Sequence, residues 1–440
     1  MKHPKIIVRP PGRKTRELIS RDYEFLSQSN PKLYPLSIDS GKHSIVKDLD
    51  GNEYIDFNAG MGCLTVGHCH PLVIDAIKKQ AEKFTHYPYS SFYHEPAVKL
   101  AETLVELSPG SFSKKVLLCS CREECIEAAL KVSRWHTRRY RVIAFSGSFH
   151  GSSMAALSIS APWRINCRKY FYSVFPWVVF TPYPYCFRCP FKLEYPECDL
   201  WCADYIEEHV FKYIVPSEEV SAIVFEPIQW EGCVIPPKEF FRRISRISDA
   251  FGLIMVDDES KCGLGRIGRW FAIEKWEITP DILCLSDTLA SGIPLGALIA
   301  RSRIMDWTEG SHESHLSGNP IACSAALSVI EVIRNEKLLE NAEKVGRVLF
   351  KGLNELKEEC QIIGDVRGSG LIVGIEIVKP ESLEPNREIA LEILRLCFKR
   401  GILPALTGES TIVLSPPLNI SIELAESGLE ILLDTIKMFY

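Results

Sequence analysis

The sequence predicts an α/β protein with a large domain, built on a mostly parallel sheet flanked by helices, and a smaller α+β domain. The chain has 440 residues, which at roughly 100–200 residues per domain suggests two or three domains. Short apolar β-rich runs alternate with helical stretches between residues 72 and 330, as in βα units. After residue 330, a long amphipathic helix is followed by a different order of strands and helices.

The elements follow from the N-terminus in order. Residues 45–57 predict two strands around an Asp-Gly turn, and we expect residues 1–71 to contribute to the small domain. The large domain, residues 72–330, has buried strands predicted at 115–119, 141–145, 222–225, 253–256 and 282–285. The C-terminal small domain, residues 331–440, has helices predicted from 342 and near 387–400, strands at 368–377 and 411–414, and a closing helix. Ligand sites are expected at the carboxyl ends of the parallel strands.

Composition excludes several classes of function. Lys and Arg number 51 against 56 Asp and Glu, a net charge of −5, so a nucleic-acid or anionic-membrane partner is not expected. No apolar run approaches the roughly 20 residues that span a bilayer, and the N-terminus has no apolar segment followed by a cleavage site. We expect a cytoplasmic protein.

Four cysteines stand out in an insertion at residues 183–202. Two close pairs within 17 residues can converge as four thiolates around one Zn²⁺, and zinc is therefore a possible cofactor. The spacing between the pairs is shorter than in common zinc ribbons, so disulfides and free thiols remain open alternatives. The predicted metal ligands are Cys186, Cys189, Cys198 and Cys202.

A series of motifs stands at the predicted strand ends. They include Val66-Gly-His-x-His70-Pro, Phe149-His150-Gly151, Glu226-Pro-Ile-Gln229-x-Glu-Gly232, Asp258-Glu259, Gly263-Leu-Gly-Arg266-x-Gly268, Gly292-x-Pro-Leu-Gly296, Gly318-Asn-Pro320 and Arg367-Gly-x-Gly. Together these motifs resemble those of the class-III (ornithine/4-aminobutyrate type) aminotransferases of fold type I. That resemblance extends over nearly the whole chain and implies pyridoxal phosphate as cofactor.

The resemblance implies a cofactor pocket whose scaffold is retained. Asp258 takes the position of the carboxylate that partners the pyridinium nitrogen, Phe149 and His150 that of groups packed on the ring, and Glu226 lies nearby. The lysine that holds the cofactor covalently belongs six residues after Asp281, where this chain has Asp287. A carboxylate cannot condense with an aldehyde.

Other anchoring positions also depart from the family pattern. Lys261 stands where the family has a Gln against the pyridoxal hydroxyl, and His315 where it has a Thr that reaches the partner's phosphate. Val413 occupies the position of the Arg that grips a substrate carboxylate.

The predicted phosphate-binding helix end carries its own anions. Its first residues, Ser120 to Glu124, include Ser120-x-x-Glu123, the pattern of a capping box that occupies the backbone donors. Two carboxylates there repel a phosphate by about 1 kcal/mol each if exposed, and Arg122 offsets part of this. We expect Lys261 and Arg122 to pair with the carboxylates of Asp258, Glu259 and Asp287.

The main prediction is a pseudoenzyme that does not bind pyridoxal phosphate covalently. It would act as a scaffold or regulatory subunit, as a homodimer or as a heterodimer with an active paralogue. Two alternatives remain: an active aminotransferase or amino-acid racemase with a displaced lysine, and an enzyme of changed chemistry that uses Lys261.

Overall fold

The computed structural model describes residues 3–163, 168–171 and 177–440. Its large domain contains a seven-stranded sheet in the order β4-β10-β9-β8-β7-β5-β6. β6, β5, β7, β8 and β9 are parallel to one another, whereas β10 is antiparallel to both β4 and β9. The strands are β4 (Lys114–Cys119), β5 (Arg141–Phe145), β6 (Val178–Thr181), β7 (Val220–Phe225), β8 (Ile254–Asp258), β9 (Ile282–Leu285) and β10 (Gly296–Arg301).

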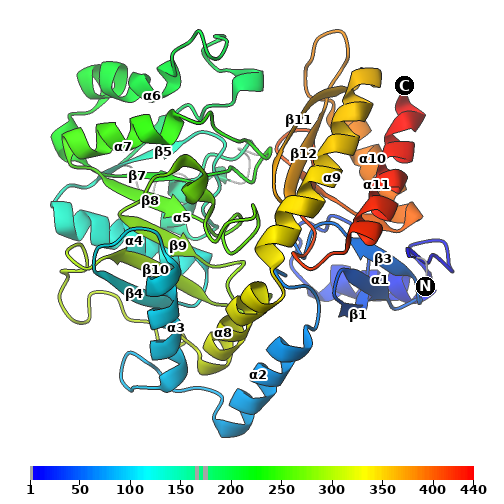
Figure 1. The fold of residues 1–440 in the computed structure, drawn as a ribbon, viewed down its shortest axis with the longest axis horizontal. Coiled ribbons are helices and arrows are strands. Elements are labelled where there is room, and N and C mark those ends of the chain that lie inside the picture. The colour runs from blue at the N-terminus through cyan, green and yellow to red at the C-terminus, as the bar shows by residue number, and fades with distance from the viewer. Residues whose placement is uncertain (1–2, 164–167, 172–176) are drawn as a thin grey trace.

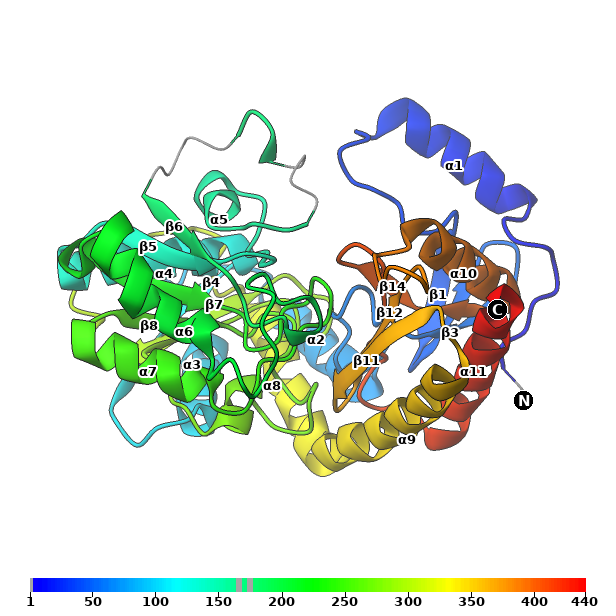
Figure 2. The same cartoon turned by 90° about the horizontal axis from the view of Figure 1, so that it is seen from above.

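Helices cover both faces of this sheet (Figures 1 and 2). The amphipathic α4 buries Cys125, Ile126 and Ala129 on one face, while α7 buries Phe240, Phe241 and Ile244 against the other. The helices of this domain are α2 (Pro71–Lys83), α3 (Glu95–Leu107), α4 (Arg122–Thr137), α5 (Met154–Ser158), α6 (Trp201–Tyr205), α7 (Phe240–Phe251) and α8 (Pro320–Asn335).

Two smaller sheets make up the other half of the molecule. One has the order β1-β2-β3-β13 and the other β11-β12-β15-β14, with α9, α10 and α11 packed around them (Figure 2). The strands are β1 (Ile38–Lys42), β2 (Ile45–Asp48), β3 (Glu53–Asp56), β11 (Ile363–Ser369), β12 (Ile372–Ile377), β13 (Ile402–Leu403), β14 (Ala405–Thr407) and β15 (Thr411–Leu414). The helices are α1 (Arg13–Phe25), α9 (Leu338–Glu359), α10 (Arg387–Arg400) and α11 (Ile422–Ile436).

The N-terminal segment pairs with the C-terminal part of the chain. Ile55 on β3 lies in parallel register with Ile402 on β13, and β2 and β3 form the antiparallel hairpin predicted around the Asp-Gly turn. The predicted fold class, a mostly parallel sheet with helices plus a smaller α+β part, is confirmed. In the described residues, no helix is both long and apolar enough to cross a membrane.

Candidate active site

The carboxyl edge of the parallel sheet brings together the residues that the sequence analysis placed in one pocket. Asp258 is the last residue of β8, Glu226 follows β7, and His150 follows β5. Arg122 opens α4, which begins just after β4. Because the carboxyl ends of neighbouring parallel strands meet at one edge, these side chains come into contact although up to 136 residues separate them.

Arg122 is the centre of this cluster. Its Nη2 lies 2.8 Å from Asp258 Oδ2 and 3.2 Å from Glu226 Oε1. His150 Nδ1 lies 2.7 Å from the same Asp258 oxygen, and the guanidinium stands 5.7 Å from the centre of the Phe149 ring. The Arg122, Asp258 and Glu226 side chains are at most 6% exposed. The expected compensation of buried carboxylates by Arg122 is therefore confirmed.

The pKa values of the two acids in the cluster shift in opposite directions. Burial alone would raise the pKa of Asp258, but the Arg122 guanidinium and His150 lower it well below its usual range. For Glu226, burial outweighs the same guanidinium, and its pKa is raised. Asp258 is thus the principal ion-pair partner, since Arg122 donates to its Oδ2 from both Nε and Nη2. A protonated pyridine nitrogen would compete with Arg122 for the same carboxylate.

Lys261 and Asp287 form a second ion pair beside the cluster. Lys261 Nζ lies 2.8 Å from Asp287 Oδ2 and donates to the carbonyl of Met61 at 2.6 Å. It also lies 5.5 Å from the centre of the Trp230 ring. The expected pairing of Lys261 is confirmed, and its amine reaches the position from which the predicted cofactor lysine is missing.

Glu259, the third carboxylate of the set expected to attract these cations, is held by other groups. Its Oε1 accepts from the backbone N–H of Ile273 at 2.8 Å, and its Oε2 contacts Cys262 Sγ at 3.4 Å. Burial without a neighbouring cation raises the pKa of Glu259 to about 7. This carboxyl group is held by the loop after β8 and faces away from the cluster of Arg122.

The capping pattern at the start of α4 uses a different glutamate from the one predicted. The Ser120 backbone N–H donates to Glu124 at 2.6 Å, and the Ser120 hydroxyl also donates to it; Glu123 instead accepts from the N–H of Ser152 at 3.2 Å. Although burial would raise the pKa of Glu124, hydrogen bonds from His312, Ser120 and Ser317 lower it to about 2. An ionised carboxylate therefore lies at the helix end that would hold a phosphate.

His312 and Ser317 escaped the sequence analysis, which had selected His315 in the same segment. His312 Nε2 lies 3.4 Å from Glu124 Oε1, and the Ser317 hydroxyl donates to that oxygen at 2.7 Å. The side chain of His315 is 79% exposed and remote from these contacts. The two histidines of this segment therefore lie in different places. His312 contacts the start of α4, and His315 lies on the surface.

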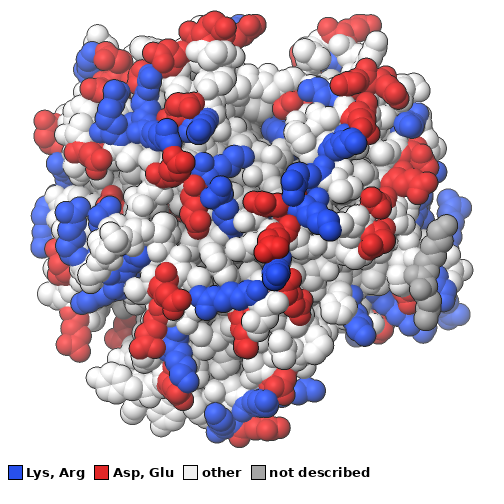
Figure 3. Space-filling model, in the orientation of Figure 1, with Lys and Arg blue, Asp and Glu red and all other residues white. Residues whose placement is uncertain are grey.

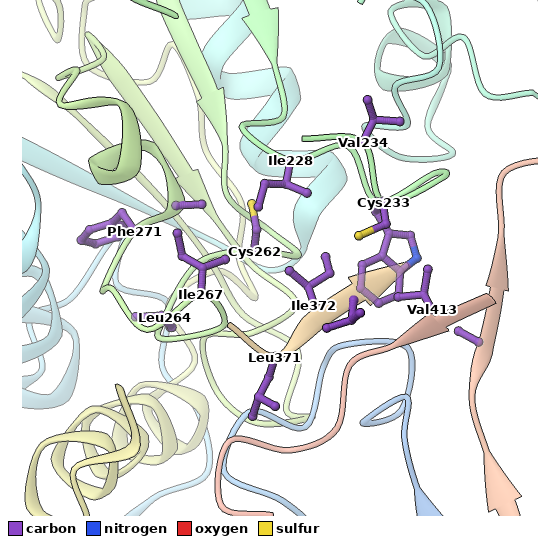
Figure 4. Close-up of a cluster of buried hydrophobic side chains, with 14 of the residues drawn as sticks. Ile228, Cys233, Val234, Cys262, Leu264, Ile267, Phe271, Leu371, Ile372 and Val413 are labelled. Carbon is purple, nitrogen blue, oxygen red and sulfur yellow. The ribbon is translucent and has the colours of Figure 1, made fainter. Parts of the chain in front are cut away.

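The predicted substrate-carboxylate position is apolar in the structure. Val413 on β15 is fully buried and lies with Cys233 and Ile372 in a cluster of hydrophobic side chains (Figure 4). The nearby Trp230 is only 5% exposed. These side chains offer no cation to a carboxylate.

The insertion is held by ion pairs and ring contacts. Arg188 Nε lies 2.5 Å from Glu376 Oε1, Arg243 pairs with Asp199 and Asp204, and the rings of Phe191 and Tyr205 lie 5.2 Å apart.

The zinc prediction is not supported by the arrangement of the insertion. Its four cysteines are free thiols, and across the described ranges no group of three or more His, Cys, Asp or Glu side chains is placed to hold a metal ion. Burial and the neighbouring cysteines raise the pKa of Cys186 to about 11 and that of Cys202 to about 12.

The whole chain is similar to known proteins of one family. The family model for class-III aminotransferases matches residues 26–436. The chain is 38% identical to an alanine/serine racemase from Pyrococcus horikoshii, over 99% of this chain and 93% of the relative. It is 35% identical to a leucine/methionine racemase from Thermococcus litoralis, over 94% of each chain. The crystal structure of an aminotransferase from Bacillus anthracis superposes with a TM-score of 0.89 at 27% identity, covering 97% of this chain and 99% of that one. The chain therefore belongs to the class-III aminotransferase family, whose members use pyridoxal phosphate.

Proposed function

We propose that this chain is a class-III aminotransferase family member that does not carry out pyridoxal phosphate chemistry and acts by association with another subunit. The observation that carries the proposal is the Arg122 guanidinium bound to Asp258 and Glu226 inside a pocket that excludes solvent. A guanidinium stays protonated at all physiological pH values, so a change of pH in that range does not release the Asp258 carboxylate from Arg122.

The other attachment points for the cofactor argue in the same direction. Position 287 offers a carboxylate instead of an amine, and the start of α4 carries the ionised Glu124. A phosphate dianion next to Glu124 meets like charge in a partly buried site. The residues present do not fit pyridoxal phosphate at its ring, its aldehyde or its phosphate. The chain's own side chains supply a cation to Asp258 and an anion to the helix end.

Association is supported by the surface as well as by the resemblance. Three exposed aromatic side chains, Tyr87, Phe92 and Tyr93, lie between α2 and α3, and the exposed fraction of Tyr93 is 102%. Exposed aromatic groups of this kind mark interaction sites. We infer a homodimer or a heterodimer with an active paralogue. Light scattering at micromolar concentration should give a dimer for the chain alone or after mixing with that paralogue; a monomer in both cases contradicts this part of the proposal.

A second candidate function is an active racemase or aminotransferase. The relatives are named as such enzymes, and they favour this alternative over the proposal above. Lys261 is the residue that would make it possible, because its Nζ lies 2.8 Å from the Asp287 carboxylate. Covalent attachment to Lys261 would require Arg122 to leave Asp258.

One experiment separates the two functions. The purified protein is mixed with pyridoxal phosphate, dialysed, treated with borohydride, and analysed by absorbance and by mass spectrometry of its peptides. The proposal predicts that no peptide carries the reduced cofactor. A modified Lys261 peptide that disappears in the Lys261→Met variant would overturn the proposal and establish the alternative.

A further inference from the structure

A hollow of about 400 Å³ lies on the outer surface between the two domains, away from the Arg122 cluster. One side is α9 and the end of β11, where Ser369 is the last residue. The other side is Arg269 and the short 3-10 helix Ala272–Trp276, which carries Lys275. Figure 3 shows Lys and Arg side chains interspersed with Asp and Glu over this face. Both domains therefore contribute to one concave site.

Three cations surround this hollow. They are Arg269, Lys275 and Arg347, and in the described part of the chain none of them forms an ion pair. Lys275 Nζ donates to the Ser369 hydroxyl at 3.2 Å, and Arg347 Nε to the backbone carbonyl of Glu343 at 3.3 Å. Burial lowers the pKa of Lys275, because it disfavours the charged form of the amine. The neighbouring Arg269 guanidinium, a like charge, lowers that pKa further.

Two carboxylates lie near these three cations: Glu343, which lines the hollow, and Glu274, whose pKa burial raises although the Arg269 guanidinium acts to lower it. The Glu343 side chain packs against Gly268, where a Cβ atom would lie 2.2 Å from Glu343 Cγ. Phe350, which lines the same hollow from α9, is 39% exposed. The hollow thus combines an excess of positive charge with an exposed aromatic ring.

We propose that this hollow binds a small phosphate-bearing anion with a planar ring, the chemistry of a nucleoside diphosphate. Several phosphate oxygens match three cations and the Ser369 hydroxyl, whereas a single carboxylate leaves two of the cations without a partner. The exposed Phe350 offers a stacking surface for the ring. Because the site draws on both domains, the ligand would restrain their relative position. This inference is independent of whether the chain binds pyridoxal phosphate.

The test is titration calorimetry of the full-length protein at low ionic strength, with ADP and inorganic pyrophosphate as separate probes. Arg347→Gln should weaken both by about tenfold, the loss expected for one charge-assisted hydrogen bond. Phe350→Ala should weaken ADP only. Arg395→Gln is the matched control, because Arg395 is an exposed cation on α10 outside the hollow, and it should leave both affinities unchanged.

Three outcomes would overturn the inference. One is the absence of measurable heat with either probe. Another is equal weakening by Arg347→Gln and Arg395→Gln, which would indicate diffuse attraction or binding near α10. ADP affinity unaffected by Phe350→Ala would overturn the ring contact and reduce the site to one for phosphate chains.

Discussion

Replacement of Arg122 by alanine should destabilise the protein strongly, because it leaves two buried carboxylates without their cation. In the native chain, Asp258 and Glu226 share the Arg122 guanidinium at 2.8 and 3.2 Å, and all three side chains are nearly inaccessible to solvent. Two neutral donors remain in the variant, the backbone N–H groups of Ser260 and Phe149, together with His150.

The size of the effect follows from the geometry. At an effective dielectric constant of about 20, each contact at this distance is worth roughly 5–6 kcal/mol, and water entering the space left by the guanidinium returns part of that loss. Removing one partner of a buried pair costs about 3–5 kcal/mol in practice. The remaining donors to Asp258 and Glu226 place the expected loss near the lower value.

The loss should also depend on pH. Without Arg122, the folded-state pKa of Asp258 rises above its unfolded value of about 4, and that of Glu226, which burial already raises, rises further. The folded variant then binds more protons than the unfolded chain, so its stability falls as pH rises through the raised pKa values. The gap between wild type and variant should therefore widen from pH 5 to pH 8.

The measurement is urea unfolding followed by fluorescence at several pH values, with Arg395→Ala as control. Arg395 forms an exposed pair with Glu392, for which a loss below about 1 kcal/mol is expected. If Arg122→Ala shifts the unfolding midpoint no more than this control at pH 8, the buried ion pair does not stabilise the fold and the reasoning is refuted.

The remaining predictions concern neighbouring positions. Asp287→Lys alone should lower the melting temperature, because the new ammonium group faces that of Lys261. The double variant with Lys261→Gln should recover most of the loss. Additive losses would show that the two positions do not interact. Neither variant should acquire covalently bound pyridoxal phosphate, since Arg122 still occupies Asp258, and a borohydride-stable adduct would contradict this. Glu259, with its pKa raised to about 7, should make wild-type stability fall between about pH 4.5 and 7, and Glu259→Gln should flatten that slope in urea titrations. An unchanged slope would remove Glu259 as the cause.

Much of the fold could be predicted because its elements have strong local patterns. The apolar runs at β5, β7, β8 and β9 are flanked by helices and were located correctly. β10, antiparallel between β4 and β9, was not predicted, although its Gly296-Ala-Leu-Ile-Ala sequence begins at the last residue of a motif that the sequence analysis singled out. Orientation within a sheet depends on long-range pairing, which a local pattern does not encode.

The site was predictable in composition but not in pairing. Asp258, Glu226 and Arg122 follow elements whose ends meet at one sheet edge, so their proximity could be inferred. Glu124 accepts a hydrogen bond from Ser120, and its carboxylate also contacts His312 and Ser317. The last two contacts form because the segment after β10 folds back over α4. No spacing within the sequence signals that contact, because 188 residues separate His312 from Glu124.

The named relatives and the local geometry favour different functions because they depend on different residues. An identity of 38% over 99% of the chain is an average over all matched positions. The chemistry of the family depends on a few positions that contribute almost nothing to that figure. Among these, Arg122 pairs with Asp258, and Lys261 pairs with Asp287. These two pairs leave Asp258 and Asp287 each with a cation, so replacing either cation exposes a carboxylate that was compensated. Such pairs are expected if the fold is stable without the charges of the cofactor. The cycle of Asp287→Lys and Lys261→Gln tests this by measuring the interaction energy between the two positions.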